Sequence, residues 1–286
     1  MSNRRILRPL NRQLNQQVEL LPIDSLLFHS PKAVERWTYN LDGQSVDRTI
    51  IYLRSDVGCE FARKTGGCTG CRHSVLGTAG ERIDGVHIRD MYKRQFDAAI
   101  ESHGYSPVMC LYNEGNILNE RELPRIQLKQ MLRQMADNGV QRVVLESRVD
   151  YIRAETLGEL CDAAGSMELE IGIGLESRSD FIRNELFLKE MSIVRFERAI
   201  ETLRSFQIRS LAYAVVKPAF LNEAQAIFDA TNTTKFAFGS GVDAVSLEPI
   251  GVEPNTIAEA LFQQGDFQPC WLWSVIEVAR ETHALG

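Results

Sequence analysis

The sequence predicts an α/β fold built on a parallel sheet, and three features of its pattern indicate this class. Short apolar, β-rich runs recur through the middle of the chain, segments with helical spacing separate them, and the runs are almost continuously apolar. Such strands are typical of a sheet that helices cover on both faces. The runs cover residues 48–55, 107–113, 142–147, 169–176, 209–217 and 244–249. Six units of this kind indicate either a doubly wound sheet or a barrel, closed or incomplete.

Residues 1–47 precede the first unit and form an expected N-terminal part. The segment MSNRRILRPLNRQLNQQ is rich in arginine and lacks the apolar stretch of a secretory signal. We expect it to lie as an arm on the domain surface, with a transit peptide as the alternative. The segment ERWTYNLDGQSVDRTII predicts a hairpin that turns at Asp42-Gly43 and extends the edge of the sheet. Residues 48–286 then form the core domain.

Helices are expected between the strands and at the C-terminal end. The segment RELPRIQLKQMLRQMADNG carries an apolar stripe and ends at Asn138-Gly139, which is a helix stop signal. The stripe consists of Ile126, Leu128, Met131, Leu132 and Met135. Ser192 is the expected N-cap of another helix. The segment PCWLWSVIEVARETHALG predicts a closing helix, with Trp271 and Trp273 plugging the barrel.

Composition and charge narrow the class of protein. The hydrophobic content of 44% and the charged content of 24% are ordinary for a globular chain. The net charge of −6 disfavours a domain that mainly holds a phosphate backbone, although Arg63, Lys64 and Arg72 could form a local basic patch. No apolar run approaches the roughly 20 residues of a spanning helix. We therefore expect a cytoplasmic protein with no membrane partner.

Polar residues cluster just after the ends of the predicted strands. They include Asn113, Glu114, Gly115, Asn116, Glu146, Arg148, Glu176, Arg178, Lys217 and Glu248. The carboxyl ends of parallel strands meet at one edge, which is where α/β proteins bind ligands. Because unpaired buried charges are costly, these side chains are hard to explain as core. We expect them to face one shared cavity, although Glu146 and Arg148 could instead form a structural ion pair.

Three of the six cysteines lie in the segment GCEFARKTGGCTGC, with the spacing C-x8-C-x2-C. Without an export signal, such a cluster indicates metal or redox chemistry rather than disulfides. A zinc site would use Cys59, Cys68, Cys71 and His73. A [4Fe–4S] cluster bound by the three cysteines alone would leave one iron free to bind another ligand. In a third interpretation, the cluster would only carry electrons.

Six motifs together resemble the radical S-adenosylmethionine superfamily. They are CEFARKTGGCTGC, LYNEGNILNERELP, LESRVDYI, IGIGLESRSDFIR, AYAVVKPAFLNEAQAIFD and SLEPIGVEPNTIAEALFQQGDFQPCWLWS. Their order and the long cysteine spacing are similar to the branch related to the Elongator catalytic subunit, and most of all to the radical subunit of archaeosine synthase and its relatives. The resemblance covers about residues 48–280. It implies a partial (β/α)6 TIM-like barrel, with the N-terminal arm and hairpin and the C-terminal closing helix added to it.

The resemblance also implies cofactors and site residues. Cys59, Cys68 and Cys71 would bind one [4Fe–4S] cluster, whose open iron would chelate S-adenosylmethionine. The residues that would contact this cofactor are Asn113, Glu114, Gly115, Asn116, Glu146, Arg148, Glu176 and Lys217. The chain departs from the pattern at Glu114, where relatives have a small serine, and at Cys270, where proline is expected. Cys270 and Tyr213 are the candidates for returning a hydrogen atom to a product radical.

The implied reaction begins with a 5′-deoxyadenosyl radical that takes a hydrogen atom from a substrate. We expect a small-molecule or natural-product substrate, with C–N cleavage, rearrangement or dehydrogenation as the possible outcomes. The alternative is cleavage of a lysine-bearing deazaguanine adduct in transfer RNA, with a partner that brings the RNA. Flavodoxin or ferredoxin would be the electron donor. A zinc-stabilised binding protein is the alternative outside the enzyme class.

Overall fold

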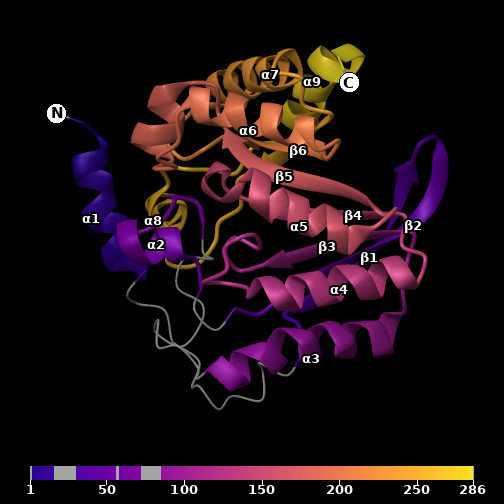
Figure 1. Cartoon of the computed structure of the whole chain (residues 1–286). Coiled ribbons are helices and arrows are strands. Elements are labelled where there is room, and N and C mark those ends of the chain that lie inside the picture. The colour runs from indigo at the N-terminus through magenta and orange to yellow at the C-terminus, as the bar shows by residue number, and fades with distance from the viewer. Residues whose placement is uncertain (1, 16–29, 56–57, 72–84, 286) are drawn as a thin grey trace.

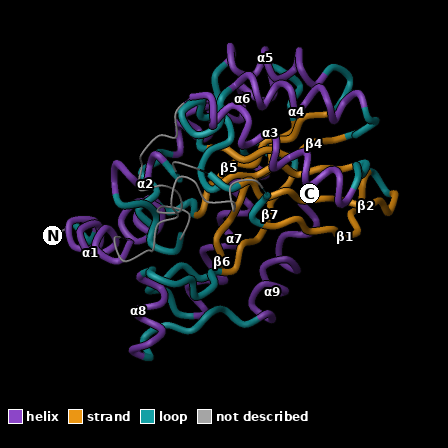
Figure 2. The backbone as a smooth tube through the Cα atoms, turned by 90° about the horizontal axis from the view of Figure 1, so that it is seen from below, coloured by secondary structure: helices purple, strands orange, loops and turns teal. Residues whose placement is uncertain are grey.

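A computed structural model describes residues 2–15, 30–55, 58–71 and 85–285 of the chain. Seven strands form one sheet in the order of the chain. They are β1 (Ala33–Leu41), β2 (Gln44–Leu53), β3 (Val108–Asn113), β4 (Arg142–Ser147), β5 (Glu168–Glu176), β6 (Arg209–Val216) and β7 (Ala244–Pro249). All neighbours from β2 to β7 are parallel. Since the order shows no reversal and the sheet curls (Figure 2), the architecture is an open barrel, as predicted, and not a doubly wound sheet.

The predicted hairpin is confirmed at the edge of the sheet. Strand β1 pairs with β2 in antiparallel fashion, and the ladder closes with Leu41 opposite Gln44. Asp42 and Gly43 form the turn with φ values of 51° and 86°. Positive φ at both central residues is what a two-residue hairpin turn of type I′ requires.

Helices cover the outer face of the sheet and one of its ends (Figure 1). They are α1 (Arg4–Asn15), α2 (Glu60–Thr65), α3 (Gly85–His103), α4 (Arg125–Asp137), α5 (Ala154–Ala164), α6 (Ile193–Ser205), α7 (Glu223–Gly239), α8 (Ile257–Gln264) and α9 (Leu272–Thr282). Three short turns follow β4, β5 and α9, namely η2 (Val149–Tyr151), η3 (Phe181–Leu186) and η4 (His283–Leu285). Helices α3, α4 and α5 lie side by side on the outside, whereas α1, α2 and α8 gather where the parallel strands end.

The predicted helix stripe is confirmed at four of its five positions. Leu128, Met131, Leu132 and Met135 of α4 are buried, but Ile126 is 59% exposed. Ile126 precedes Leu128 by two residues, a rotation of about 200° around the helix, so it faces away from the sheet. The predicted N-cap is also confirmed, because the Ser192 hydroxyl accepts a hydrogen bond from the Arg195 amide.

The C-terminal helix α9 packs against α7. Trp271 and Trp273 stand at its start and are 69% and 75% exposed. The prediction that these two side chains plug the barrel was therefore wrong. They project to solvent from the start of α9. Residues of the strands line the inner face of the sheet instead.

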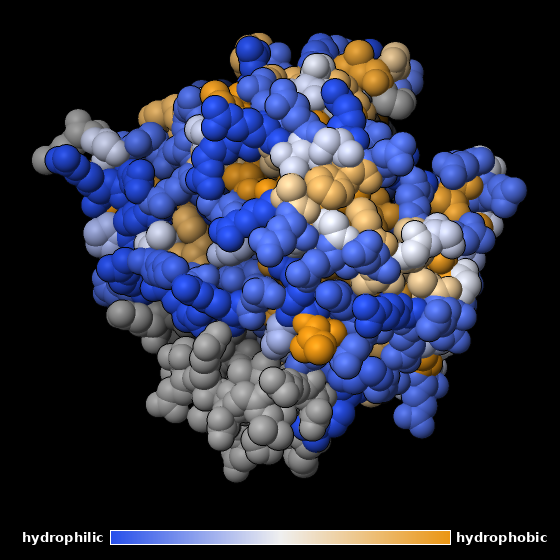
Figure 3. Space-filling model, viewed as in Figure 1, coloured by the Kyte–Doolittle hydropathy of each residue, from blue (hydrophilic) through white to orange (hydrophobic). Residues whose placement is uncertain are grey.

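One large apolar cluster joins the sheet to its outer helices from β2 to α7. The face that α3, α4 and α5 turn to solvent is mostly hydrophilic, with only scattered apolar side chains (Figure 3). Within the described residues, no helix is both long and apolar enough to cross a membrane.

Candidate active site

A cavity of about 580 Å³ lies against the inner face of the sheet and extends to the end where the parallel strands finish. We call it the central cavity. Residues from all seven strands and from the cysteine loop line it. Ten of the predicted site residues are among them, namely Cys59, Cys68, Cys71, Asn113, Gly115, Asn116, Glu146, Arg148, Glu176 and Tyr213. A volume of this size is typical of a site for a small molecule or cofactor.

The cysteine loop places its three thiols on this one cavity. Cys59 precedes α2, and the chain then turns through Gly66 and Gly67, with φ values of 95° and 78°, before it reaches Cys68 and Cys71. Burial raises the pKa of Cys59 to about 11, and burial also raises the pKa of Cys68. A buried thiolate needs a compensating positive charge, which a bound metal centre supplies.

The donor set agrees with a cluster that is held by thiolates alone. Cys59, Cys68 and Cys71 form no disulfide bonds, and all three line the central cavity. Across the described part of the chain, no three Cys, His, Asp or Glu side chains converge on a site for a single metal ion. The fourth ligand of the zinc alternative, His73, lies outside the described residues.

Glu122 connects the cysteine loop to the turn after β3, and its role was not predicted. Its carboxylate accepts hydrogen bonds from the amide of Glu60 at 2.8 Å, from the side chain of Asn119 at 2.9 Å and from the amide of Asn116. A Cβ atom at Gly115 would collide with this carboxylate. The side chain of Asn116 also lies 3.9 Å from the sulfur of Cys59. The sequence offered one signal, an acidic residue that directly follows the polar run from Asn119 to Arg121.

Glu114 lies in the same turn but does not line the central cavity. Its carboxylate pairs with Lys32 at 3.2 Å and accepts a hydrogen bond from the Ser55 amide at 3.1 Å. Because successive residues of an extended chain point in opposite directions, its neighbours Asn113 and Gly115 face the cavity while Glu114 faces away.

Arg148 does not pair with Glu146, so the alternative of a structural ion pair between them was wrong. Its guanidinium donates to Asp150 at 3.0 Å and to the carbonyl of Lys189 at 3.0 Å, and it stacks on Phe61 at 3.9 Å from the ring centre. The chain leaves strand β4 at Ser147, which directs Arg148 toward the cysteine loop.

Glu146 remains on the floor of the cavity beside two tyrosines. Burial raises its pKa to about 7; the neighbouring Tyr213 hydroxyl lowers the pKa, while the nearby Glu248 raises it. Burial likewise raises the pKa of Tyr213 well above its usual value, and Glu146 and Tyr112 add to this rise. A carboxyl group with this pKa can take up or release a proton near neutral pH.

Two glycines of strand β5 leave space on the inner face of the sheet for neighbouring side chains. A Cβ atom at Gly172 would lie 2.6 Å from the ring of Tyr213, and one at Gly174 would collide with Glu176 and Lys189. Glu176 pairs with Lys189 at 2.5 Å. Burial lowers the pKa of Lys189, but Glu176 and Cys68 outweigh burial, so the pKa is raised and the ammonium stays charged. The cavity thus has positive charge beside its cysteines and carboxylates on its floor.

Lys217 and Cys270 lie together outside the central cavity. Lys217 pairs with Glu223 at 2.6 Å, and Glu223 also accepts a hydrogen bond from the Trp271 amide at 2.9 Å. Cys270 packs into the small apolar cluster that includes Val278, and burial raises its pKa. These contacts join α9 to β6 and α7, so the structure does not bring these two predicted residues to the cavity.

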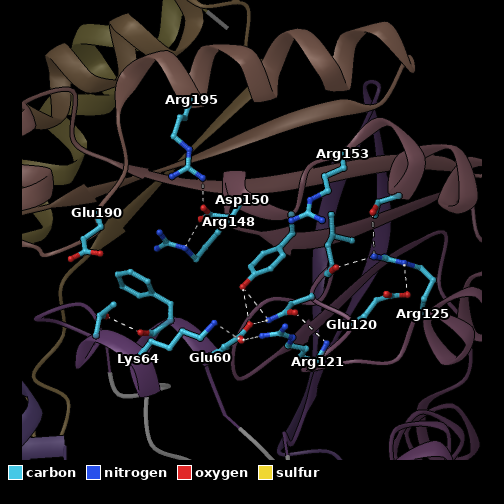
Figure 4. Close-up of a pocket in the computed structure, with 16 residues that line it drawn as sticks. Glu60, Lys64, Glu120, Arg121, Arg125, Arg148, Asp150, Arg153, Glu190 and Arg195 are labelled. Carbon is cyan, nitrogen blue, oxygen red and sulfur yellow. Dashed lines mark hydrogen bonds and ion pairs between the residues drawn. The ribbon is translucent and has the colours of Figure 1, made fainter.

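A second, charged cavity of about 580 Å³ adjoins the central cavity, because Phe61 and Arg148 line both. Figure 4 shows the side chains that line this second cavity. Its walls come from α2, from the turns after β3 and β4, and from α6. Most of its charges are paired: Glu60 binds Lys64 and Arg121 at 2.7 Å each. Arg153, on the rim, has no ion pair within the described residues.

No known protein family profile matches the chain. A curated protein named archaeosine synthase subunit beta, from Methanosarcina acetivorans, is 29% identical over 240 residues, which are 83% of this chain and 67% of that protein. An uncharacterized protein from Methanocaldococcus jannaschii is 27% identical over 246 residues, which are 83% of this chain and 65% of that protein. The chain is therefore similar in sequence to archaeosine synthase subunit beta. It spans about two thirds of the length of these relatives.

Solved structures confirm the predicted fold. The queuine lyase from Clostridium spiroforme, bound to SAM and queuine, superposes with a TM-score of 0.53 at 16% identity, over 82% of this chain and 90% of that one. A radical S-adenosylmethionine methyltransferase from Kitasatospora setae reaches 0.50 at 13% identity, over 75% and 39%. The chain has the partial-barrel fold of the radical S-adenosylmethionine enzymes. Both the family resemblance and the fold class predicted from the sequence are therefore confirmed.

Proposed function

We propose that this chain, which is similar in sequence to archaeosine synthase subunit beta, is a radical S-adenosylmethionine enzyme. Cys59, Cys68 and Cys71 would hold one [4Fe–4S] cluster, and the central cavity would hold S-adenosylmethionine beside it. The observation that carries the proposal is that three cysteine thiols line one cavity together with the strand-end residues. When bound and reduced, the cluster supplies the electron that splits the cofactor into methionine and the 5′-deoxyadenosyl radical.

The two ends of the central cavity differ in the residues that line them, and we assign one end to the cofactor and the other to the substrate. Arg148 and Lys189 lie beside the cysteines and offer cationic partners for the carboxylate of the methionine group. Gly172 and Gly174 leave room against β5 for the rest of the cofactor. Glu146 would lie at the substrate end, where its carboxylate can accept a proton from a substrate ammonium group near neutral pH.

For the reaction, we propose cleavage of a C–N bond in a small-molecule or natural-product substrate. The lyase class is what the resemblance of the sequence motifs implies, and the size of the central cavity supports a small substrate. Tyr213 lines this cavity and stays the candidate for hydrogen return, whereas Cys270 lies outside it. Flavodoxin or ferredoxin is the proposed electron donor, in the reducing cytoplasm that free thiolates need.

The test is anaerobic. The protein is reconstituted with iron and sulfide, reduced, and given S-adenosylmethionine, and 5′-deoxyadenosine is measured. Wild type should form the product, and so should Cys161→Ala, because Cys161 belongs to α5, packs against the large apolar cluster and does not line the central cavity. Cys68→Ala should lose the cluster and the product. A colourless wild type that holds zinc and forms no product would overturn the proposal.

Cleavage of a lysine–deazaguanine adduct in transfer RNA is the second candidate function. Two observations favour it: the name of the homologues, and the arginine-lined charged cavity next to the central one. These homologues are named as a subunit, so a partner chain belongs to this candidate. Binding to bulk transfer RNA should then weaken steeply with salt, and Arg153→Ala should weaken it further than Arg198→Ala on the outside of α6. Binding that does not respond to salt or to Arg153→Ala would contradict this candidate and favour the small-molecule substrate.

A further inference from the structure

The first helix lies directly against the cysteine loop. Side chains of α1 donate hydrogen bonds to five consecutive backbone carbonyls of that loop, from Lys64 to Cys68. Arg12 Nη2 donates to Lys64 at 3.4 Å, Arg8 Nη1 to Thr65 at 3.0 Å and to Gly67 at 3.4 Å, and Asn11 Nδ2 to Gly66 at 2.6 Å and to Cys68 at 3.3 Å. Helices α1 and α2 are neighbours in both views of the chain (Figures 1 and 2).

The contact is close, and most of its hydrogen bonds are buried or half-buried. Asn11 is only 1% exposed, and its side-chain amide donates to the carbonyls of Gly66 and Cys68, on either side of Gly67. Gly66 has a φ of 95°, and a Cβ atom there would lie 3.3 Å from the Cβ atom of Arg12. The loop backbone therefore approaches the helix where a larger residue would not fit.

The same face of α1 also binds the segment that follows β5. Glu190 of that segment pairs with Arg8 at 2.6 Å and also with Arg4. The same segment holds the cysteine loop directly, because Thr69 donates to the carbonyls of Phe187 at 3.2 Å and of Leu186 at 3.0 Å. The cysteine loop thus contacts both α1 and the segment that follows β5, and these two are themselves joined by ion pairs.

We propose that α1 is a strap that keeps the cysteine loop in the shape needed to bind its metal centre, with Asn11 and Arg8 as positioning residues. This inference rests on the proposed function. Eight residues separate Cys59 from Cys68. Ordering so long a loop costs conformational entropy, which the strap offsets with hydrogen bonds that lie outside the cavity.

The first test measures how fast the cluster is lost. Reconstituted protein is challenged with an iron chelator under anaerobic conditions, and the decay of the cluster absorbance is followed. Asn11→Asp keeps the shape of the side chain but removes its donors, so the cluster should be lost at least about fivefold faster than in wild type. Arg8→Lys keeps the charge toward Glu190 but loses the forked donors, and it should act in the same direction. Arg5→Ala, an exposed change on the same helix, should match wild type.

A second test needs no iron and separates the strap from the proposed function. The iron-free variants are alkylated with iodoacetamide, and the labelling of each cysteine is measured by mass spectrometry. Labelling of Cys68 and Cys71 should speed up in Asn11→Asp and Arg8→Lys, while labelling of Cys161 and the thermal midpoint stay close to those of Arg5→Ala. Equal labelling and equal cluster loss in all variants would overturn the strap. A wild type that binds no iron but still shows faster labelling in the variants would overturn the cluster and leave the strap on the loop standing.

Discussion

At the scale of single residues, Glu146 is a carboxyl group of the central cavity whose pKa lies in the neutral range. Its pKa is raised to about 7 because the carboxyl group is buried on the floor of the central cavity. Folding therefore favours the protonated form. The stabilising contribution of that form is fully present below the ordinary pKa of a glutamate and is lost as the pH rises through about 7.

Glu146→Gln should remove this pH dependence from the iron-free protein. Since glutamine stays neutral, the variant should gain thermal stability relative to wild type above pH 7, by about 2–4 °C, and show little gain near pH 4. Melting curves across this pH range would measure the difference. Glu101→Gln, an exposed change on α3, serves as the control and should follow wild type at every pH. A constant difference between Glu146→Gln and wild type would contradict the raised pKa.

At the scale of elements, β5 determines how much room the cavity has. Its inner face carries glycine at alternate positions, so the ring of Tyr213 and the Glu176–Lys189 pair can lie against bare backbone. Glycine in the middle of a strand is ordinarily unfavourable because it costs backbone entropy and packs no side chain. Its presence twice on one face is consistent with close approach of other groups.

Gly172→Ala should therefore harm both stability and cofactor binding. The new methyl group would force the ring of Tyr213 to move, at a cost of about 1–3 kcal/mol in the free energy of unfolding. Urea denaturation of the iron-free protein would measure it. Gly158→Ala makes the same change in α5, where the nearest atom would be 3.8 Å away, and should be neutral or slightly stabilising. Equal stability of the two variants would show that the ring is not held against β5.

At the scale of the whole molecule, the central cavity draws its walls from all seven strands and from the cysteine loop. A ligand that fills it contacts the entire sheet at once. Binding should therefore stabilise the folded chain as a unit, by an amount that depends on the ligand concentration relative to its dissociation constant.

S-adenosylmethionine should raise the thermal midpoint of the cluster-loaded protein. At about one hundred times the dissociation constant, the gain is about 2.7 kcal/mol, or several degrees for a chain of this size. The iron-free protein should gain less, because it offers no iron to the amino and carboxylate groups of the cofactor. Differential scanning fluorimetry under anaerobic conditions would compare the two forms. Equal shifts would indicate that the cofactor binds without contacting the cluster.

The sequence by itself determined the strands, their parallel arrangement, the hairpin turn and the cysteine loop. These features depend on local patterns: apolar runs, helix periodicity, an Asp-Gly turn and cysteine spacing. It also predicted ten site residues that line the central cavity, because side chains that follow parallel strands meet at one edge. Ile126 was misplaced since an apolar residue can stand outside a stripe without breaking its spacing.

Only the tertiary structure decided which strand-end residues face inward and what holds the cysteine loop. Glu114 turns away toward Lys32, and Lys217 turns toward Glu223, because the direction of a side chain after a strand depends on the partners that the fold brings near it. Asn11 meets the carbonyls of Gly66 and Cys68 across more than fifty positions of sequence. Contacts between a side chain and a distant backbone leave no pattern in the sequence, so no spacing or composition could have predicted them.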